Sequence, residues 1–110
     1  MLKKEDLPEC PVATTVQLIG NKWKLLILRN LQIRPWRFNE LQKSLEWISQ
    51  KVLTQSLRSM ESDGIIVRTV YAEVPPRVEY TLTDTGYSLE PILDSMYSWG
   101  ENYKRNLDVQ

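Results

Sequence analysis

Hydrophobic residues near the start of the chain recur at the spacing of a helix. Val12, Val16 and Ile19 lie about one turn apart in a segment that opens at Pro11 and stops at Gly20. Proline suits the first turn of a helix because its missing N–H has no partner there, and glycine is common directly after the last turn. The pattern predicts a helix over residues 10–20.

A second apolar segment follows at once. Asn21 can cap a helix that runs from Lys22 to about Leu31. Apolar side chains on nearly all sides of a helix are typical of a position at the centre of a domain. The residues that place this helix there are Trp23, Leu25, Leu26, Ile27, Leu28 and Leu31.

The next segments predict two helices joined by a tight connection. After Pro35, Phe38 and Leu41 have helical spacing, Ser49 offers an N-cap for a longer helix, and that helix ends at Gly64. A short helix, a tight turn and a longer second helix form the helix-turn-helix pattern. We therefore expect the helix after Ser49 to be a recognition helix.

Hydrophobic periodicity then changes from 3.6 to 2. Alternating residues over 65–71 and 78–82 predict the two strands of a hairpin, and the loop 72–77 contains two prolines that stiffen it. This loop is a candidate wing. A last helix starts near Thr83 or Asp84, either of which can cap it, and runs over residues 84–106.

The order of elements predicts a single domain over residues 1–110, mainly α with a small β-hairpin (α+β). Its class is a winged helix-turn-helix with a core at 22–82 and extra helices at both ends. The last helix has more apolar surface than a helix at the edge of a domain exposes, which indicates burial by a partner in a homodimer. Its apolar stripe consists of Leu89, Ile92, Leu93, Met96, Gly100 and Tyr103, and Tyr97 and Trp99 widen it. The residues assigned to the dimer interface are Leu89, Ile92, Leu93, Met96, Trp99 and Tyr103.

Charges cancel over the whole chain but not along it. The 14 Lys and Arg residues balance 14 Asp and Glu residues over the whole chain. The segment from Lys22 to Arg58, however, contains eight cations and two acids, which give it a net charge of +6. Since binding to nucleic-acid phosphates needs cations, this segment predicts a positive surface. The alternative interpretation is that these cations cluster in the sequence by chance.

Composition excludes several classes of function. With no histidine and one cysteine, Cys10, the chain offers neither a conventional zinc site nor a Cys-His nucleophile. Its isolated glycines form no phosphate-binding loop, so we expect no enzymatic activity, metal or cofactor. The polar start of the chain and its short apolar runs predict a cytoplasmic protein without a membrane partner.

The predicted recognition helix has one polar face. On a helical wheel Gln50, Lys51, Thr54, Gln55, Arg58 and Ser62 share an arc opposite the apolar residues. Glutamine reads adenine, lysine and arginine read guanine, and threonine contacts the thymine methyl group. An ordinary solvated helix face would look the same, but the helix before it and the hairpin after it favour DNA.

We assign these residues provisional roles. The start of a recognition helix enters the major groove, so the candidates for base contact are Ser49, Gln50, Lys51, Thr54 and Gln55. The candidates for phosphate contact are Arg37, Asn39, Lys43 and Arg58. Arg77, placed at the tip of the wing, is either an exposed loop charge or a side chain that enters an adjacent minor groove.

Several segments in order resemble the HxlR family of bacterial transcriptional regulators. They are Cys10-Pro11-Val12, Asn21-Lys22-Trp23, Leu26-Ile27-Leu28, Arg37-Phe38-Asn39-Glu40-Leu41, Ile48 to Gln55 with Leu57-Arg58, Val74-Pro75-Pro76 and Arg77-Val78-Glu79-Tyr80. Asn21 and Trp47 depart from the family, which commonly has glycine at both positions.

The resemblance implies a dimer assembled through the terminal helices, with Val12 and Val16 in the interface. It also implies double-stranded DNA with a palindromic operator as the partner, and repression more often than activation. Some members of the family sense electrophiles such as quinones and aldehydes, hypochlorite or disulfide stress through the cysteine at the position of Cys10.

Local chemistry gives the sensing hypothesis partial support. Cys10 directly precedes a helix, whose amide dipoles favour a thiolate, but Glu9 and Asp6 oppose this effect. A small residue packed at a helix start is the alternative interpretation.

Two other functions stay open. Tyr97, Trp99 and Tyr103 with Trp23 could line a pocket for a noncovalent small ligand at a dimer interface. Winged helices also serve as protein-docking domains, which the overall neutrality of the chain allows and the local charge of +6 opposes.

Overall fold

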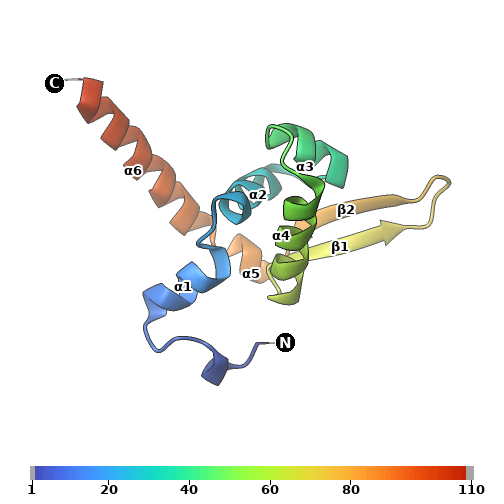
Figure 1. Ribbon diagram of the computed structural model, residues 1–110, viewed down its shortest axis with the longest axis horizontal. Coiled ribbons are helices and arrows are strands. Elements are labelled where there is room, and N and C mark those ends of the chain that lie inside the picture. Colours follow the sequence, from blue (N-terminus) through green and yellow to red (C-terminus); the bar gives the residue numbers. More distant parts are fainter. Residues whose placement is uncertain (1, 109–110) are drawn as a thin grey trace.

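The fold is a small helical body from which a hairpin and a long helix project (Figure 1). Over residues 2–108, which are the residues described, the computed structural model has six α-helices, one 3-10 turn and two strands. In chain order these are η1 (Lys4–Asp6), α1 (Pro11–Ile19), α2 (Lys22–Ile33), α3 (Phe38–Ser44), α4 (Gln50–Ser62), β1 (Ile66–Tyr71), β2 (Arg77–Leu82), α5 (Asp84–Tyr87) and α6 (Glu90–Asp108).

The helices α2 and α4 begin directly after the N-cap residues expected from the sequence. The Asn21 side chain accepts hydrogen bonds from the amides of Trp23 and Lys24 at 2.9 and 3.3 Å, and Ser49 Oγ accepts one from Val52 N at 3.1 Å. Such caps satisfy amides that have no partner within the helix. They place the starts of α2 and α4 where the sequence predicted them.

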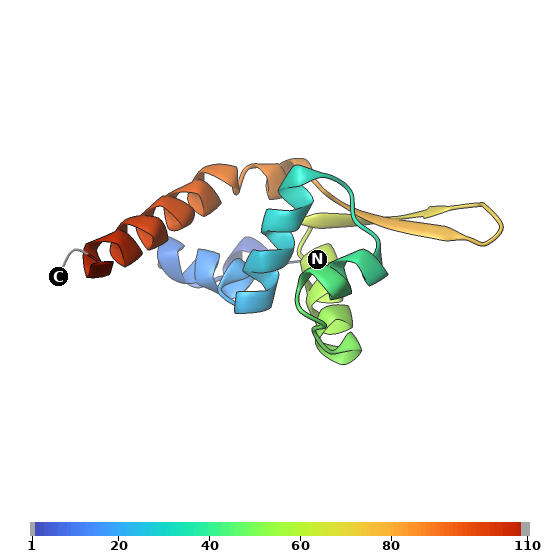
Figure 2. The ribbon, with the colours of Figure 1, turned by 90° about the horizontal axis from the view of Figure 1, so that it is seen from above.

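The hairpin forms a two-stranded antiparallel sheet. Its register pairs Ile66 with Leu82 at the base and Tyr71 with Arg77 at the far end. Trp36 and Tyr80 form an isolated bridge, with N···O distances of 3.1 and 2.8 Å. This bridge joins the connection before α3 to the sheet, and Figure 2 shows the hairpin extending beyond the helices.

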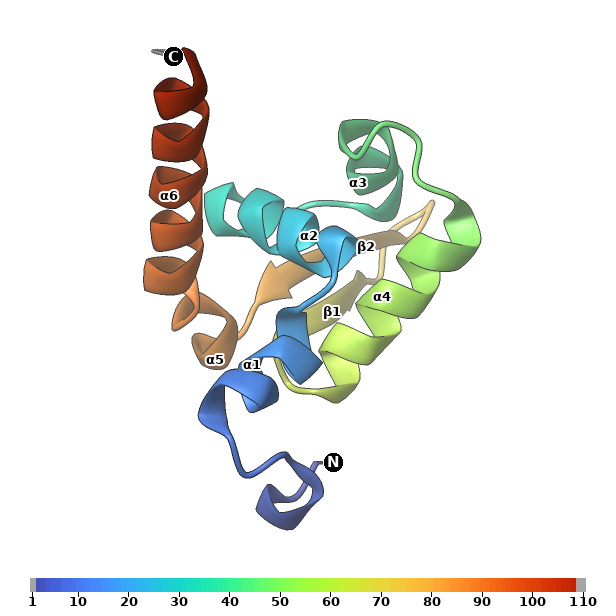
Figure 3. The same ribbon diagram turned by 60° about the vertical axis from the view of Figure 1, so that its left-hand side comes forward.

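The hydrophobic core lies where α2, α4 and the base of the hairpin meet. α2 runs between α4 and α6, as Figure 3 shows. Burial of apolar side chains is the main favourable term in folding, and every element from α2 to β2 contributes to it. The fully buried side chains are Ile27, Leu28, Leu31, Leu41, Leu53, Met60, Ile65 and Ile66.

The predicted single helix over residues 84–106 is wrong, because it is two helices. α5 ends at Tyr87, Ser88 is its C-cap, and α6 begins at Glu90. The break has a local cause: Pro91 has no N–H to donate to the carbonyl of Tyr87, and its ring would clash with that carbonyl in a continuous helix. None of the described helices is long and apolar enough to cross a membrane.

The turn before α4 has an unusual backbone. Glu46 and Trp47 have φ angles of 56° and 61°, in the left-handed region that favours glycine. This explains why glycine suits position 47, where Trp47 stands with 71% of its surface exposed. Asn21, with a φ of −132°, has no such need and caps α2 instead.

Candidate nucleic-acid interface

The polar face of α4 lies on the surface. Gln50, Lys51, Gln55 and Arg58 are exposed and Thr54 is half-buried. Ser49 is exposed as well, and its side chain caps the helix. We call Ser49, Gln50, Lys51, Thr54, Gln55 and Arg58 the recognition face.

The opposite side of α4 anchors it in the core. Leu53, Leu57 and Met60 are buried, and Lys24 Nζ of α2 donates to Ser59 Oγ at 3.0 Å. These contacts fix the rotation of the helix about its own axis. The recognition face is therefore presented outward by a rigidly packed element, as base reading requires.

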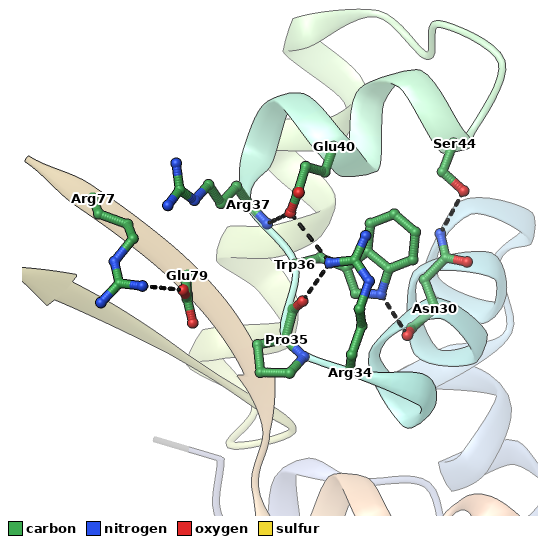
Figure 4. A network of polar contacts seen from close by, with 9 residues as sticks. All are labelled: Asn30, Arg34, Pro35, Trp36, Arg37, Glu40, Ser44, Arg77 and Glu79. Atoms are coloured by element: carbon green, nitrogen blue, oxygen red, sulfur yellow. Dashed lines mark hydrogen bonds and ion pairs between the residues drawn. The ribbon is translucent and has the colours of Figure 1, made fainter.

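The start of α3 is organised by one carboxylate. Glu40 Oε1 accepts from the backbone amide of Arg37 at 2.9 Å and pairs with the Arg34 guanidinium at 3.3 Å. The amide hydrogen bond, followed by Arg34, lowers the pKa of Glu40 below its ordinary value despite partial desolvation. Figure 4 shows that the Arg37 side chain points away from Glu40 while its backbone donates, so its charge stays available.

Besides Lys24, which donates to Ser59, the cations of residues 22–58 fall into two groups. Lys22, Arg29 and Arg34 lie over the rings of Trp23, Tyr97 and Trp36, at 4.8, 4.7 and 3.6 Å from the ring centroids. In the part of the chain that the structure describes, four others have no carboxylate within 4.0 Å: Arg37, Lys43, Lys51 and Arg58. All four lie on or next to α3 and α4, and all four were predicted to contact DNA. Asn39 is also exposed on α3.

Arg77 does not lie at the tip of the wing. It is the first residue of β2, and its guanidinium pairs with Glu73 at 3.2 Å and Glu79 at 3.0 Å while lying 4.0 Å from the centre of the Tyr71 ring. The expectation of a free loop arginine is therefore wrong. Two acids that lie four residues before it and two residues after it neutralise its charge.

A hollow of about 490 Å³ separates α4 from the hairpin. The predicted residues Gln50, Thr54 and Arg58 line one side of it, and Arg68 of β1 lines the other. Sequence analysis missed Arg68, although the period of 2 along this strand places it on the same face as the buried Ile66. The remaining lining residues are Phe38, Leu57, Glu61 and Tyr80.

The terminal helices expose much of the predicted dimer surface. Val12 and Val16 of α1 are exposed, as are Ile92, Met96, Trp99 and Tyr103 of α6. We call these six residues the apolar ridge. Leu93 is different, since it is buried in the core of its own chain, and Leu89 packs half-buried against that core. Assigning Leu93 to a free interface is therefore wrong.

Within one chain, the aromatic residues proposed to line a ligand pocket at a dimer interface border different hollows. Tyr97 borders a hollow of about 310 Å³ between α2 and α6, whereas Trp23 borders a separate hollow of about 320 Å³ beside α3. Trp99 and Tyr103 line neither of these hollows and instead stack on each other, with ring centroids 5.3 Å apart.

Comparison with known proteins identifies the family. A family model described as HxlR-like helix-turn-helix matches residues 18–108. The chain belongs to this family. A relative from Bacillus subtilis (strain 168), the uncharacterized HTH-type transcriptional regulator YdeP, is 48% identical over 104 residues, which cover 94% of this chain and 81% of YdeP. The chain is a transcriptional regulator with a helix-turn-helix fold.

Solved structures of HxlR-like regulators have the same winged-helix architecture. The redox regulator HypR in its reduced form has 42% identity and a TM-score of 0.84, over 92% of this chain and 100% of that chain. The reduced form of the transcriptional regulator YodB from B. subtilis has 34% identity and a TM-score of 0.76, over 87% of this chain and 95% of that chain. The predicted winged-helix fold is confirmed.

Proposed function

We propose that this regulator binds double-stranded DNA as a homodimer, reads a palindromic operator with the recognition face, and represses the adjacent genes. The observation that carries this proposal is the exposed, acid-free recognition face on a helix held firmly in the core. Four cations without a carboxylate partner in the described chain lie in that face, as Lys51 and Arg58 do, or on and next to α3, as Lys43 and Arg37 do. Phosphate attraction and base reading both need this combination.

The roles of the residues follow from their places on the two helices. Ser49, Gln50, Lys51, Thr54 and Gln55, at the start of α4, would contact base edges in the major groove. The side chains that would contact phosphates, and so set the register on the duplex, are Arg37, Asn39, Lys43 and Arg58.

A homodimer accounts for the apolar ridge. Six large apolar side chains on the two terminal helices are exposed to water in the single chain. Exposed apolar surface of this kind is typical of a protein–protein interface. A twofold-symmetric dimer would bury this surface and place two copies of α4 at matching half-sites of a palindrome.

The base-contact assignment is tested with alanine at Lys51 or at Gln55. We expect either change to weaken binding to DNA from upstream of the protein's own gene by about 1 to 3 kcal/mol, because a specific base contact is lost. Binding to a scrambled duplex of equal length should change much less. Both are measured by fluorescence anisotropy at two salt concentrations.

Lys104→Ala on α6 is the matched control, because it removes one exposed lysine far from α4 and should leave both affinities unchanged. Equal weakening on operator and scrambled DNA would refute the base-contact roles of Lys51 and Gln55. If the wild-type protein binds no DNA, a protein-docking role replaces the one proposed.

A redox response through Cys10 is supported by two observations. Cys10 is exposed directly before α1, next to the Val12 end of the apolar ridge. HypR and YodB are both similar to this chain, and HypR is described as a redox regulator. Joining the Cys10 sulfur atoms of two chains in a disulfide would release two hydrogens to an oxidant and alter the interface that spaces the half-sites.

Diamide, which accepts those two hydrogens, tests the response. We expect it to crosslink the wild-type protein on a non-reducing gel and to change operator affinity at least severalfold, since the dimer interface is altered. The Cys10→Ser variant should bind operator with the affinity of the untreated wild-type protein, and diamide should not change that affinity. An identical response of both proteins to diamide would show that Cys10 is not the sensor and is a structural residue at the start of α1.

A further inference from the structure

The hollow between α4 and β1 brings together two arginines from consecutive elements of the chain. Arg58 of α4 and Arg68 of β1 both line it, with Gln50 and Thr54 beside them. Both arginines are exposed, and neither has a carboxylate within 4.0 Å among the described residues. Glu61, one turn further along α4, is the one acid in the lining.

The two arginines of the hairpin differ sharply in what their charges contact. Arg77 is held by two carboxylates and a tyrosine ring, so binding another anion would require breaking two ion pairs. Arg68 has no such ion pair among residues 2–108. The hairpin therefore presents its available positive charge at its base, beside α4, and not at its far end.

We propose that this hollow is a binding site for one phosphate of the DNA backbone, held by Arg58 and Arg68. A guanidinium pairs with phosphate through two parallel N–H···O bonds, and guanidiniums on two walls of the hollow can donate to both unesterified oxygens of one phosphodiester. Gln50 and Thr54 of the recognition face line the same hollow. A phosphate seated there would fix the position of α4 relative to the bases that it reads. This site rests on the proposed function, since its occupant is operator DNA.

The test compares Arg68→Gln with Arg77→Gln, two substitutions that each remove one positive charge from the hairpin. The slope of log K for operator binding against log salt concentration reports the number of phosphates neutralised. We expect Arg68→Gln to reduce the steepness of this slope by about 0.9 for each of the two half-sites, and the affinity on the order of tenfold. Arg77→Gln should leave the slope unchanged, because its guanidinium is occupied within the hairpin.

Two further variants guard against effects on folding. Arg68→Lys keeps the charge and should retain the slope, while Glu61→Gln removes the opposing acid and should raise operator affinity severalfold. A wild-type slope in Arg68→Gln, or equal losses in Arg68→Gln and Arg77→Gln, would overturn the site while the proposed function stands. Absence of DNA binding by the wild-type protein would overturn both.

Discussion

If the proposed homodimer forms, aspartate at Trp99 is expected to convert it to a monomer and to lower operator affinity on the order of a hundredfold. Trp99 is 69% exposed in the single chain and stacks on Tyr103 with an angle of 12° between the ring planes. Large aromatic side chains at the centre of an interface contribute most of its binding energy, and a carboxylate in their place would be buried without a partner.

Loss of the dimer affects DNA binding through geometry. A dimer that holds one half-site keeps its second recognition helix beside the other, so the second contact forms at a high effective concentration. A monomer has no such advantage. Sedimentation equilibrium at micromolar protein concentration gives the mass, and operator titration gives the affinity.

Ser98→Asp is the matched control, because it adds the same charge one position earlier on the exposed side of α6. One residue corresponds to a rotation of about 100° around a helix, so this charge should point away from the apolar ridge. The Ser98→Asp protein should stay dimeric. A dimeric Trp99→Asp protein would show that α6 is not the interface.

Local signals predicted the scaffold of the recognition face well. The cap at Ser49 and the alternation of polar and apolar residues along α4 are both decided within a few residues of sequence. The structure confirms the cap and buries the apolar residues Leu53 and Leu57. It leaves the polar residues Lys51 and Gln55 outside.

Contacts that depend on how the hairpin folds and packs could not be predicted in the same way. Glu73 and Glu79 surround Arg77 because the last turn of the loop and the pleat of β2 place all three on one side of the hairpin. The sequence shows three charges within seven residues but not which side of the hairpin each side chain occupies. Arg68 and Arg58 likewise meet across a hollow only once β1 packs on α4.

The apolar stripe of the last helix shows a second limit. Periodicity identifies residues that avoid water, but not whether their own chain or a partner covers them. Leu93 and Trp99 belong to one predicted stripe, yet the first is buried against α2 and the second is exposed. The direction in which α6 leaves the body decides between them, and that direction depends on the break before Pro91.

Alanine at Leu53 should lower the free energy of unfolding by about 2 to 5 kcal/mol. Leu53 is fully buried on the inner side of α4, so truncation loses apolar contacts and leaves a cavity that close packing fills only in part. Domains of this size have a free energy of unfolding of about 5 to 15 kcal/mol, so Leu53→Ala should remove a large fraction of the stability. Urea unfolding at a fixed protein concentration measures the shift of the midpoint.

Val70→Ala is the control, since Val70 is a half-exposed residue of the projecting hairpin and its truncation should change stability by no more than about 0.5 kcal/mol. The same cavity should also reduce operator affinity, because Leu53 is among the residues that hold the recognition face in its fixed rotation. A Leu53→Ala protein as stable as Val70→Ala would show that α4 is not anchored through this side chain. Recognition by a rigid helix would then lose its physical basis.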